Sequence, residues 1–210
     1  MKARRAARTV VVVAICACII VAYYIYLDRS TSKNVANSDN VQVTEKDRLL
    51  DMDFGKNYPP TPREVIKTYN RYLSLCIGNT KLSKKDVKTL SGKIREMMDS
   101  ELANENPPDE YADRLASEIN DYKSRKAKII STQVCDTSDV IYGKLDGKDV
   151  AYVQAGYSIK EASSYSKTYQ KFVLRMDSNN HWKIVGFHLT DADGNTISGG
   201  HTIKAGEKTK

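Results

Sequence analysis

A long uncharged segment near the N-terminus constrains this chain more than any other feature. It spans residues 9–27 (TVVVVAICACIIVAYYIYL) and follows four basic residues, Lys2, Arg4, Arg5 and Arg8. A helix rises about 1.5 Å per residue, so a segment of this length spans roughly the 30 Å hydrocarbon core of a bilayer. The sequence therefore predicts one transmembrane helix over residues 9–27.

The charges around this segment predict its orientation. Basic side chains crowd the short tail of residues 1–8, whereas the residues after the span mix both signs. Positive flanks stay in the cytoplasm, and tyrosines such as Tyr23, Tyr24 and Tyr26 favour the membrane interface. We expect a single-pass protein of the cell membrane with a cytoplasmic N-terminus and an extracytoplasmic C-terminal domain.

Two other interpretations of the apolar segment were weighed. A cleaved signal peptide would have a shorter apolar region and a small-residue cleavage site soon after it. A lipoprotein signal ending at Cys18 would place the polar mature chain directly after that cysteine, but more apolar residues follow. An uncleaved anchor, with Cys16 and Cys18 as small apolar residues of the helix, is favoured.

The rest of the chain divides by composition. Residues 28–58 are polar and lack apolar periodicity, which predicts a flexible tether. Residues 59–190 are long enough for one core, and residues 191–210 are a polar, glycine-rich tail expected to be flexible, either frayed or a loose hairpin. The net charge of +7 belongs largely to the N-terminal tail, so no nucleic-acid partner is expected.

The first half of the domain has helical signals. Residues 61–64 (TPRE) form a capping box with proline at the first helical position, and a second helix is signalled by Ser83 and Asp86. A third helix begins at Pro107 or Pro108. The second helix is expected to extend as far as Leu102. Its apolar residues at helical spacing are Val87, Leu90, Ile94, Met97, Met98 and Leu102.

After Arg125 the apolar period changes to two and β-branched residues dominate, which predicts a sheet. Strands are expected over residues 127–135, 139–145, 149–161, 164–176 and 181–190. One face of the sheet should be covered by the helices and should carry Ala151, Val153, Ala155, Tyr157, Ile159, Phe172, Leu174, Met176, Val185, Phe187 and Leu189. The fold class is α+β.

The opposite face of this sheet is expected to be half apolar. We predict that it is an interface for a protein partner or a second copy, because aromatic side chains among lysines are typical of such surfaces. The candidate residues are Tyr152, Tyr165, Tyr169, Trp182 and Ile184, with Val173 beside them. These tyrosines could equally pair across strands and lie on solvated lysine stems.

Helices followed by a long antiparallel meander resemble the nuclear-transport-factor-2-like (NTF2-like) superfamily. The likeness rests on residues 170–175 (QKFVLR), the turn after them and residues 182–186 (WKIVG). It implies a cone of about three helices packed on a curved sheet. The anchor, the tether and residues 57–65 (NYPPTPREV) also resemble a family of uncharacterised single-pass membrane proteins of Gram-positive bacteria, which implies location without mechanism.

No set of residues predicts catalysis, a metal or a cofactor. Enzymes of the NTF2-like superfamily place an Asp or a His–Asp pair inside the cone, and His181, His188 and His201 do not match that pattern. Residues 191–195 (DADGN) resemble part of a calcium loop but lack its further ligands, so a turn is expected. Cys76 and Cys135 are expected as free thiols, although extracytoplasmic oxidation would permit a bridge.

The function that these patterns favour is a membrane-anchored binding or assembly module without catalytic activity. One alternative is a scaffold subunit of a secretion or conjugation system, since that plan also has one span and an extracytoplasmic NTF2-like domain. A second alternative is a hydrolase or isomerase, which would need an ionisable group buried in the cone with a perturbed pKa.

The predicted topology is tested by labelling the tether. In a variant without native cysteines, Ser38→Cys should react with an impermeant maleimide added to intact cells, because the tether is expected outside. Labelling only after lysis would reverse the orientation.

Overall fold

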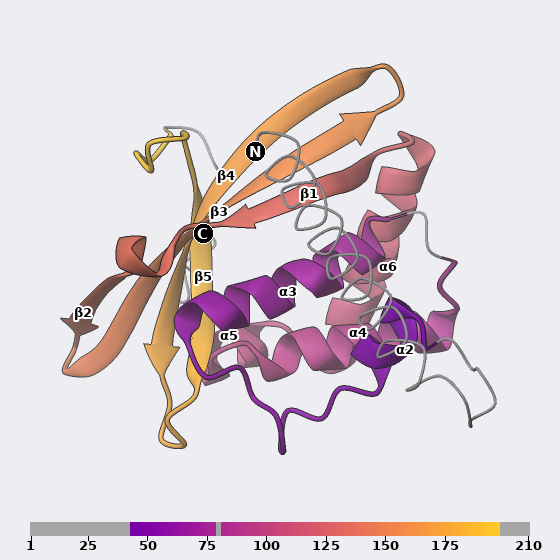
Figure 1. Ribbon diagram of the computed structural model, residues 1–210. Coiled ribbons are helices and arrows are strands. Elements are labelled where there is room, and N and C mark those ends of the chain that lie inside the picture. Colours follow the sequence, from indigo (N-terminus) through magenta and orange to yellow (C-terminus); the bar gives the residue numbers. More distant parts are fainter. Residues whose placement is uncertain (1–42, 79–80, 198–210) are drawn as a thin grey trace, which may run out of the picture. The chain divides into compact units, whose positions relative to one another are not determined.

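An antiparallel sheet with helices packed on one of its faces makes up the described part of the chain (Figure 1). The computed structural model describes residues 43–78 and 81–197, and the residues from Thr44 onward form one compact unit. No helix among them is long and apolar enough to cross a membrane. The predicted span of residues 9–27 lies outside the described residues, as do residues 1–8, 28–42 and 198–210.

The helices begin where polar side chains can cap them. Side-chain oxygens of Thr44, Thr61, Ser83 and Asp99 each accept a hydrogen bond from a backbone N–H of the first turn, which satisfies groups that have no partner within the helix. The predicted starts at Thr61, Ser83 and Pro107–Pro108 are confirmed. The α-helices in the described residues are α2 (Glu45–Leu50), α3 (Pro62–Cys76), α4 (Lys84–Glu96), α5 (Ser100–Glu105) and α6 (Pro108–Ser124).

The prediction that the second helix continues to Leu102 is wrong. Helix α4 ends at Glu96, and the chain leaves the helix to pair with the edge of the last strand. Ile184 donates its N–H to the Met97 carbonyl at 2.8 Å and accepts the Asp99 N–H at 2.8 Å. Asp99 then caps α5, so Met97, at the C-cap of α4, and Leu102, on α5, both remain buried.

The five predicted strands are confirmed as β1 (Lys128–Val134), β2 (Ile141–Leu145), β3 (Lys148–Glu161), β4 (Ser164–Met176) and β5 (Trp182–Thr190). A short 3₁₀ helix, η1 (Thr137–Asp139), connects β1 to β2. The sheet order is β1-β3-β4-β5, and β2 pairs with the same edge of β3 as β1 does. Asp146 and Gly147 both have positive φ in the β2–β3 turn, as a tight hairpin requires.

Helix α3 packs its apolar stripe onto the helix-covered face, here called the inner face. Its residues Val65, Ile66 and Tyr72 are fully buried, and the ring of Tyr69 meets Phe172 of β4 edge-on at 5.5 Å. The expected inner-face residues of β3 and β4 are in this core, including Ala151, Val153, Ala155, Tyr157, Phe172 and Leu174. The space between helices and sheet is therefore filled by side chains.

A β-bulge in β5 overturns the expected placement of Trp182 and Ile184. Phe187 pairs with Phe172 as an inner-face residue, but Leu174 pairs with Ile184 instead of Val185, so Val185 is the extra residue. The bulge returns Ile184 and Trp182 to the inner face, where they are only 4% and 7% exposed. The prediction that these two residues lie on the opposite face is wrong.

The predicted tether over residues 28–58 is corrected from Thr44 onward. Those residues form α2 and a loop that pack on the core through Leu49 and Phe54, both buried. The hydroxyl of Tyr72 donates to the Leu49 carbonyl at 3.0 Å, and Phe54 contacts the Tyr72 ring. The domain therefore begins before residue 59, because two large apolar side chains in a polar stretch were enough to dock it.

The packing of α2 is tested by matched truncations of aliphatic side chains in a fragment of residues 44–210. Leu49→Ala removes a fully buried side chain, so unfolding in urea should show a loss of about 2–5 kcal/mol. Ile130→Ala, at an exposed position of β1 outside any proposed contact, should change stability by less than about 0.5 kcal/mol. Equal, small effects of the two substitutions would mean that α2 is not docked.

Candidate functional site

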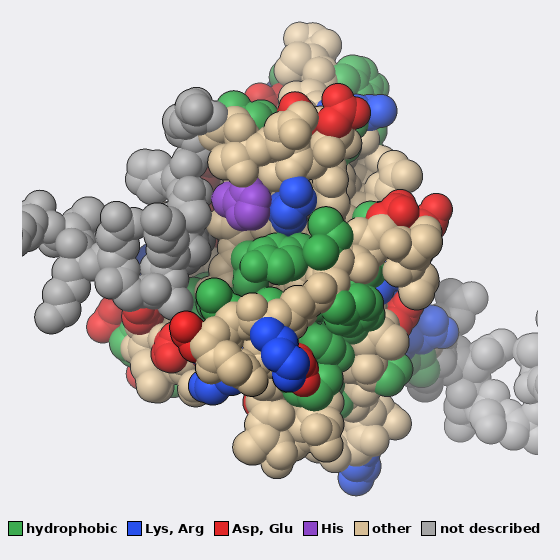
Figure 2. Space-filling model, turned by 90° about the vertical axis from the view of Figure 1, so that its left-hand side faces the viewer, with side chains coloured by type: hydrophobic (Ala, Val, Ile, Leu, Met, Phe, Trp, Pro, Cys, Tyr) green, Lys and Arg blue, Asp and Glu red, His purple; other side chains and the backbone are tan. Residues whose placement is uncertain are grey.

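One hollow in the described residues lies on the sheet face opposite the helices, here called the outer face. Figure 2 looks onto this side of the molecule and shows hydrophobic side chains gathered among basic and acidic ones. The outer-face pocket has a volume of about 560 Å³. Its lining residues are Gln133, Cys135, Asp139, Ile141, Tyr152, Gln154, Gly156, Tyr169, Lys171, Ala192 and Asp193.

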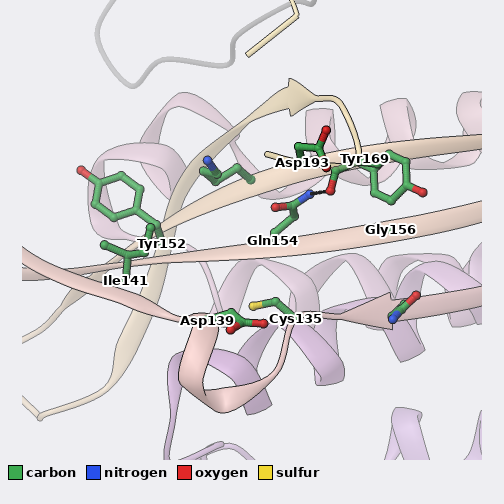
Figure 3. A pocket seen from close by; sticks show the side chains of 11 residues that line it. Cys135, Asp139, Ile141, Tyr152, Gln154, Gly156, Tyr169 and Asp193 are labelled. Carbon is green, nitrogen blue, oxygen red and sulfur yellow. Dashed lines mark hydrogen bonds between the residues drawn. The ribbon is translucent and has the colours of Figure 1, made fainter. Parts of the chain in front are cut away.

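Strands β3 and β4 form the floor of the pocket. Gln154 pairs with Lys171 and Gly156 pairs with Tyr169, so their positions alternate with the inner-face residues of the same strands. A Cβ at Gly156 would lie 3.1 Å from two carbons of the Tyr169 ring. Glycine at this position therefore allows the ring to lie close over β3. In Figure 3 the Tyr152 and Tyr169 side chains lie at opposite ends of the pocket with Gln154 between them.

One wall is the turn that follows β5. The Gln154 amide donates to the carbonyls of Asp191 and Ala192 at 3.2 and 3.1 Å, and Lys171 donates to the Gly194 carbonyl at 2.5 Å. Side chains on the floor thus fix the turn over the sheet. The sequence motif of residues 191–195 is a turn, as expected, closed by the bond from the Asp191 N–H to the Asn195 carbonyl.

Of the two forms expected for the tail, residues 191–197 adopt the hairpin rather than a frayed end. The Asp191 carboxylate accepts hydrogen bonds from the Asn195 side chain and backbone, which hold its pKa below the ordinary value. The Ile197 N–H returns to the Leu189 carbonyl at 3.2 Å. The described part of the tail is therefore a structured return against β5, and it supplies Ala192 and Asp193 to the pocket.

The opposite wall is the connection from β1 to β2. Cys135 donates its N–H to the Gln154 carbonyl, and Arg63 of α3 donates to the Cys135 carbonyl at 2.7 Å. Asp139 at the end of η1 lies beside Cys135 in Figure 3. A helix side chain thus holds the segment that bridges the gap between β1 and β2.

Both described cysteines are free thiols, in agreement with the favoured prediction. Burial raises the pKa of the Cys135 thiol, and it raises that of Cys76, in the core, to about 12. Neither thiol is activated as a nucleophile, because activation requires a lowered pKa. Within residues 43–78 and 81–197, no group of three or more His, Cys, Asp or Glu side chains could hold a metal ion.

The structure brings together only part of the predicted interface. Tyr152 and Tyr169 line the pocket, whereas Tyr165 lies on the same face farther along β4, exposed and with the Lys160 ammonium 5.3 Å from its ring. Trp182 and Ile184 are on the inner face. Sequence reasoning missed Gln154 and Lys171, since nothing in the strand pattern indicated that they would hold the turn after β5.

Glu118 of α6 is exposed, yet partial desolvation by its neighbours raises the pKa of its carboxyl above the ordinary value. Its charge also contributes to raising the pKa values of Tyr69, Tyr111 and Cys76, which places it near them. Because Glu118 is exposed, it is not the buried ionisable group that an enzymatic alternative requires.

Comparison with known proteins gives a family and no activity. A family model matches residues 1–187 of the chain, and its description is Domain of unknown function (DUF6715). No curated protein matches the sequence.

Proposed function

Since the chain belongs to the DUF6715 family, a domain of unknown function, we propose its function from geometry: it is a membrane-anchored extracytoplasmic module that binds a ligand in the outer-face pocket. The observation that carries this proposal is the construction of the pocket. Three separate segments, the β3–β4 floor, the β1–β2 connection and the turn after β5, are fixed there by side-chain hydrogen bonds. Such pre-organisation lowers the cost of binding.

The chemistry of the lining indicates the class of ligand. Apolar groups from Ile141, Tyr152 and Tyr169 alternate with amide and carboxylate groups from Gln133, Asp139 and Asp193. A purely apolar ligand would leave these polar groups without partners, which is unfavourable. A ligand with both apolar surfaces and hydrogen-bonding groups fits better. At the outer side of a membrane, a peptidoglycan fragment combines sugar and peptide groups of this kind.

We also propose that the domain is an NTF2-like cone. The support is the order of elements, with helices first and a long antiparallel meander after them, and the β5 bulge that accompanies the turn of the sheet around the core. The proposed localisation, with residues 9–27 in the membrane and the domain outside, is supported by the apolar segment and the basic residues before it.

Two other functions stay as alternatives. A scaffold subunit of a secretion or conjugation system would use the same anchor and domain, with a protein partner on the outer face. A hydrolase or isomerase would need an ionisable group buried in the interior, whereas Glu118, whose pKa is raised, is exposed. The filled core makes this second alternative weaker, because a substrate would need space that apolar side chains occupy.

Binding is tested with defined muropeptides titrated into the purified full-length protein in nanodiscs, followed by calorimetry. Exchanging Tyr152 and Tyr169 together for alanine should weaken binding at least about tenfold, because two fully occupied contacts each contribute on the order of 1 kcal/mol or more. Tyr165→Ala is the matched control and should leave affinity unchanged, since this exposed tyrosine lies outside the pocket.

Two results would contradict the proposal. If wild-type protein bound no muropeptide, the ligand class would be wrong, and photo-crosslinking from position 152 in cells would then test for a protein partner. If the paired alanine variant bound as tightly as the Tyr165 control, the outer-face pocket would not be the site.

A further inference from the structure

Strand β2 exposes an unusual amount of apolar surface. Ile141, Tyr142 and Leu145 are 58%, 57% and 52% exposed, although they belong to a strand of only five residues. They alternate between the two faces, so neither face of β2 is a solvated polar surface. Apolar side chains concentrated on one short strand indicate a contact with another molecule.

The outward edge of β2 is also open. Within the described residues, β2 pairs with β3 alone, and Figure 1 shows it at the margin of the sheet. An edge strand presents backbone N–H and C=O groups that another strand can bind, and proteins usually protect such edges with proline or charge. The strand has no proline, and its one charged residue, Lys144, is engaged with Asp149 at 3.0 Å.

The sequence of β2 is complementary to itself in one antiparallel register. A two-fold axis through Gly143 places Ile141 opposite Leu145 of a second copy, and Tyr142 opposite the second copy's Lys144. Direct cross-strand neighbours have Cβ atoms about 4.5–5.5 Å apart, so the apolar pairs and the lysine–tyrosine pairs can form twice each. Gly143 faces Gly143 of the second copy at the axis.

We propose that β2 pairs with β2 of a second copy of this chain in this register, which joins the two sheets into one. The pairing is isologous, so it closes as a dimer and leaves the β2 edges covered. It buries Ile141 and Leu145 on the outer face and Tyr142 on the other face, where the Tyr142 ring already contacts Trp182 at 5.8 Å. The occupant of the edge is a second copy because the pattern complements itself.

The dimer also changes the outer-face pocket. The consequence for ligand binding rests on the proposed function. Ile141 lines that pocket and pairs with Tyr152 of β3. In the paired state, Leu145 of the second copy lies next to Ile141 and extends the apolar wall. Ligand binding and dimerisation are then coupled, whereas the dimer itself does not require that the pocket bind anything.

Disulfide trapping in the full-length protein in its native membrane tests the pairing. In a variant without native cysteines, Gly143→Cys should form an intermolecular disulfide under mild oxidation, because the two positions face each other within the Cα separation of about 4.4–6.8 Å that a bridge requires. A Cβ at Gly143 meets only ordinary contacts within the chain, so the substitution fits the fold. Ser163→Cys, at the exposed β3–β4 turn, is the control and should remain monomeric.

Charge substitutions then test the register. Ile141→Lys and Leu145→Glu should each reduce trapping at position 143 at least about fivefold, because each puts a charge against an apolar side chain. The two together should restore trapping, since each lysine then faces a glutamate of the other copy. Absence of a disulfide at position 143, equal trapping at position 163, or no restoration by the combined substitutions would each overturn the proposal. If the disulfide at position 143 formed as expected but the wild-type protein bound no muropeptide, only the proposed function would be contradicted.

Discussion

The bulge at Val185 in β5 decides which side of the sheet becomes core and which becomes surface. Without it, strict alternation would place Trp182 and Ile184 on the outer face. With it, Phe187, Ile184 and Trp182 all face the helices. Phe187 and Ile184 are an odd number of positions apart, which regular alternation would place on opposite faces. One extra residue therefore moves two large apolar side chains from solvent into the core.

The elements that pack around the start of β5 depend on this bulge. Tyr58 donates its hydroxyl to the Trp182 carbonyl at 2.8 Å, and the segment after α4 exchanges hydrogen bonds with Ile184. Asp99, which caps α5, binds the Arg175 guanidinium; burial opposes ionisation of this carboxyl, but Arg175 and the Glu101 N–H together lower its pKa. The residues around Trp182, Ile184 and Asp99 thus connect the core, the edge of β5 and the start of α5.

The same partition leaves the outer face for function. With Trp182 and Ile184 on the inner face, the apolar groups of the outer face include Val173, the tyrosines of β3 and β4, and Ile141 and Leu145 of β2. The tyrosines line a pocket that ordered side chains close on two sides, and β2 offers an edge to another strand. Binding and dimerisation are therefore proposed at neighbouring places on one surface.

Local patterns predicted most of the fold, because caps and strand periodicity are properties of short segments. Thr61, Ser83 and Pro108 marked helix starts, and the alternation in β3 and β4 identified the core face. Docking of α2 depends on a contact with Tyr72 that no local pattern reveals. The bulge is likewise invisible in β5, and with it the true positions of Trp182 and Ile184. Of the residues predicted for an interface, Tyr152 and Tyr169 line the outer-face pocket, whose role is a proposal, whereas the side chains that hold the pocket's turn follow only from strand pairing.

Fluorescence of Trp182 tests the central claim most directly, because it is the single tryptophan of the chain. The account places it on the inner face against Tyr142, so emission of the folded protein should be blue-shifted relative to the unfolded chain and weakly quenched by acrylamide. A red-shifted emission that acrylamide quenches as efficiently in the folded as in the unfolded protein would put Trp182 on the outer face. That result would contradict the bulge and the division of the sheet that follows from it.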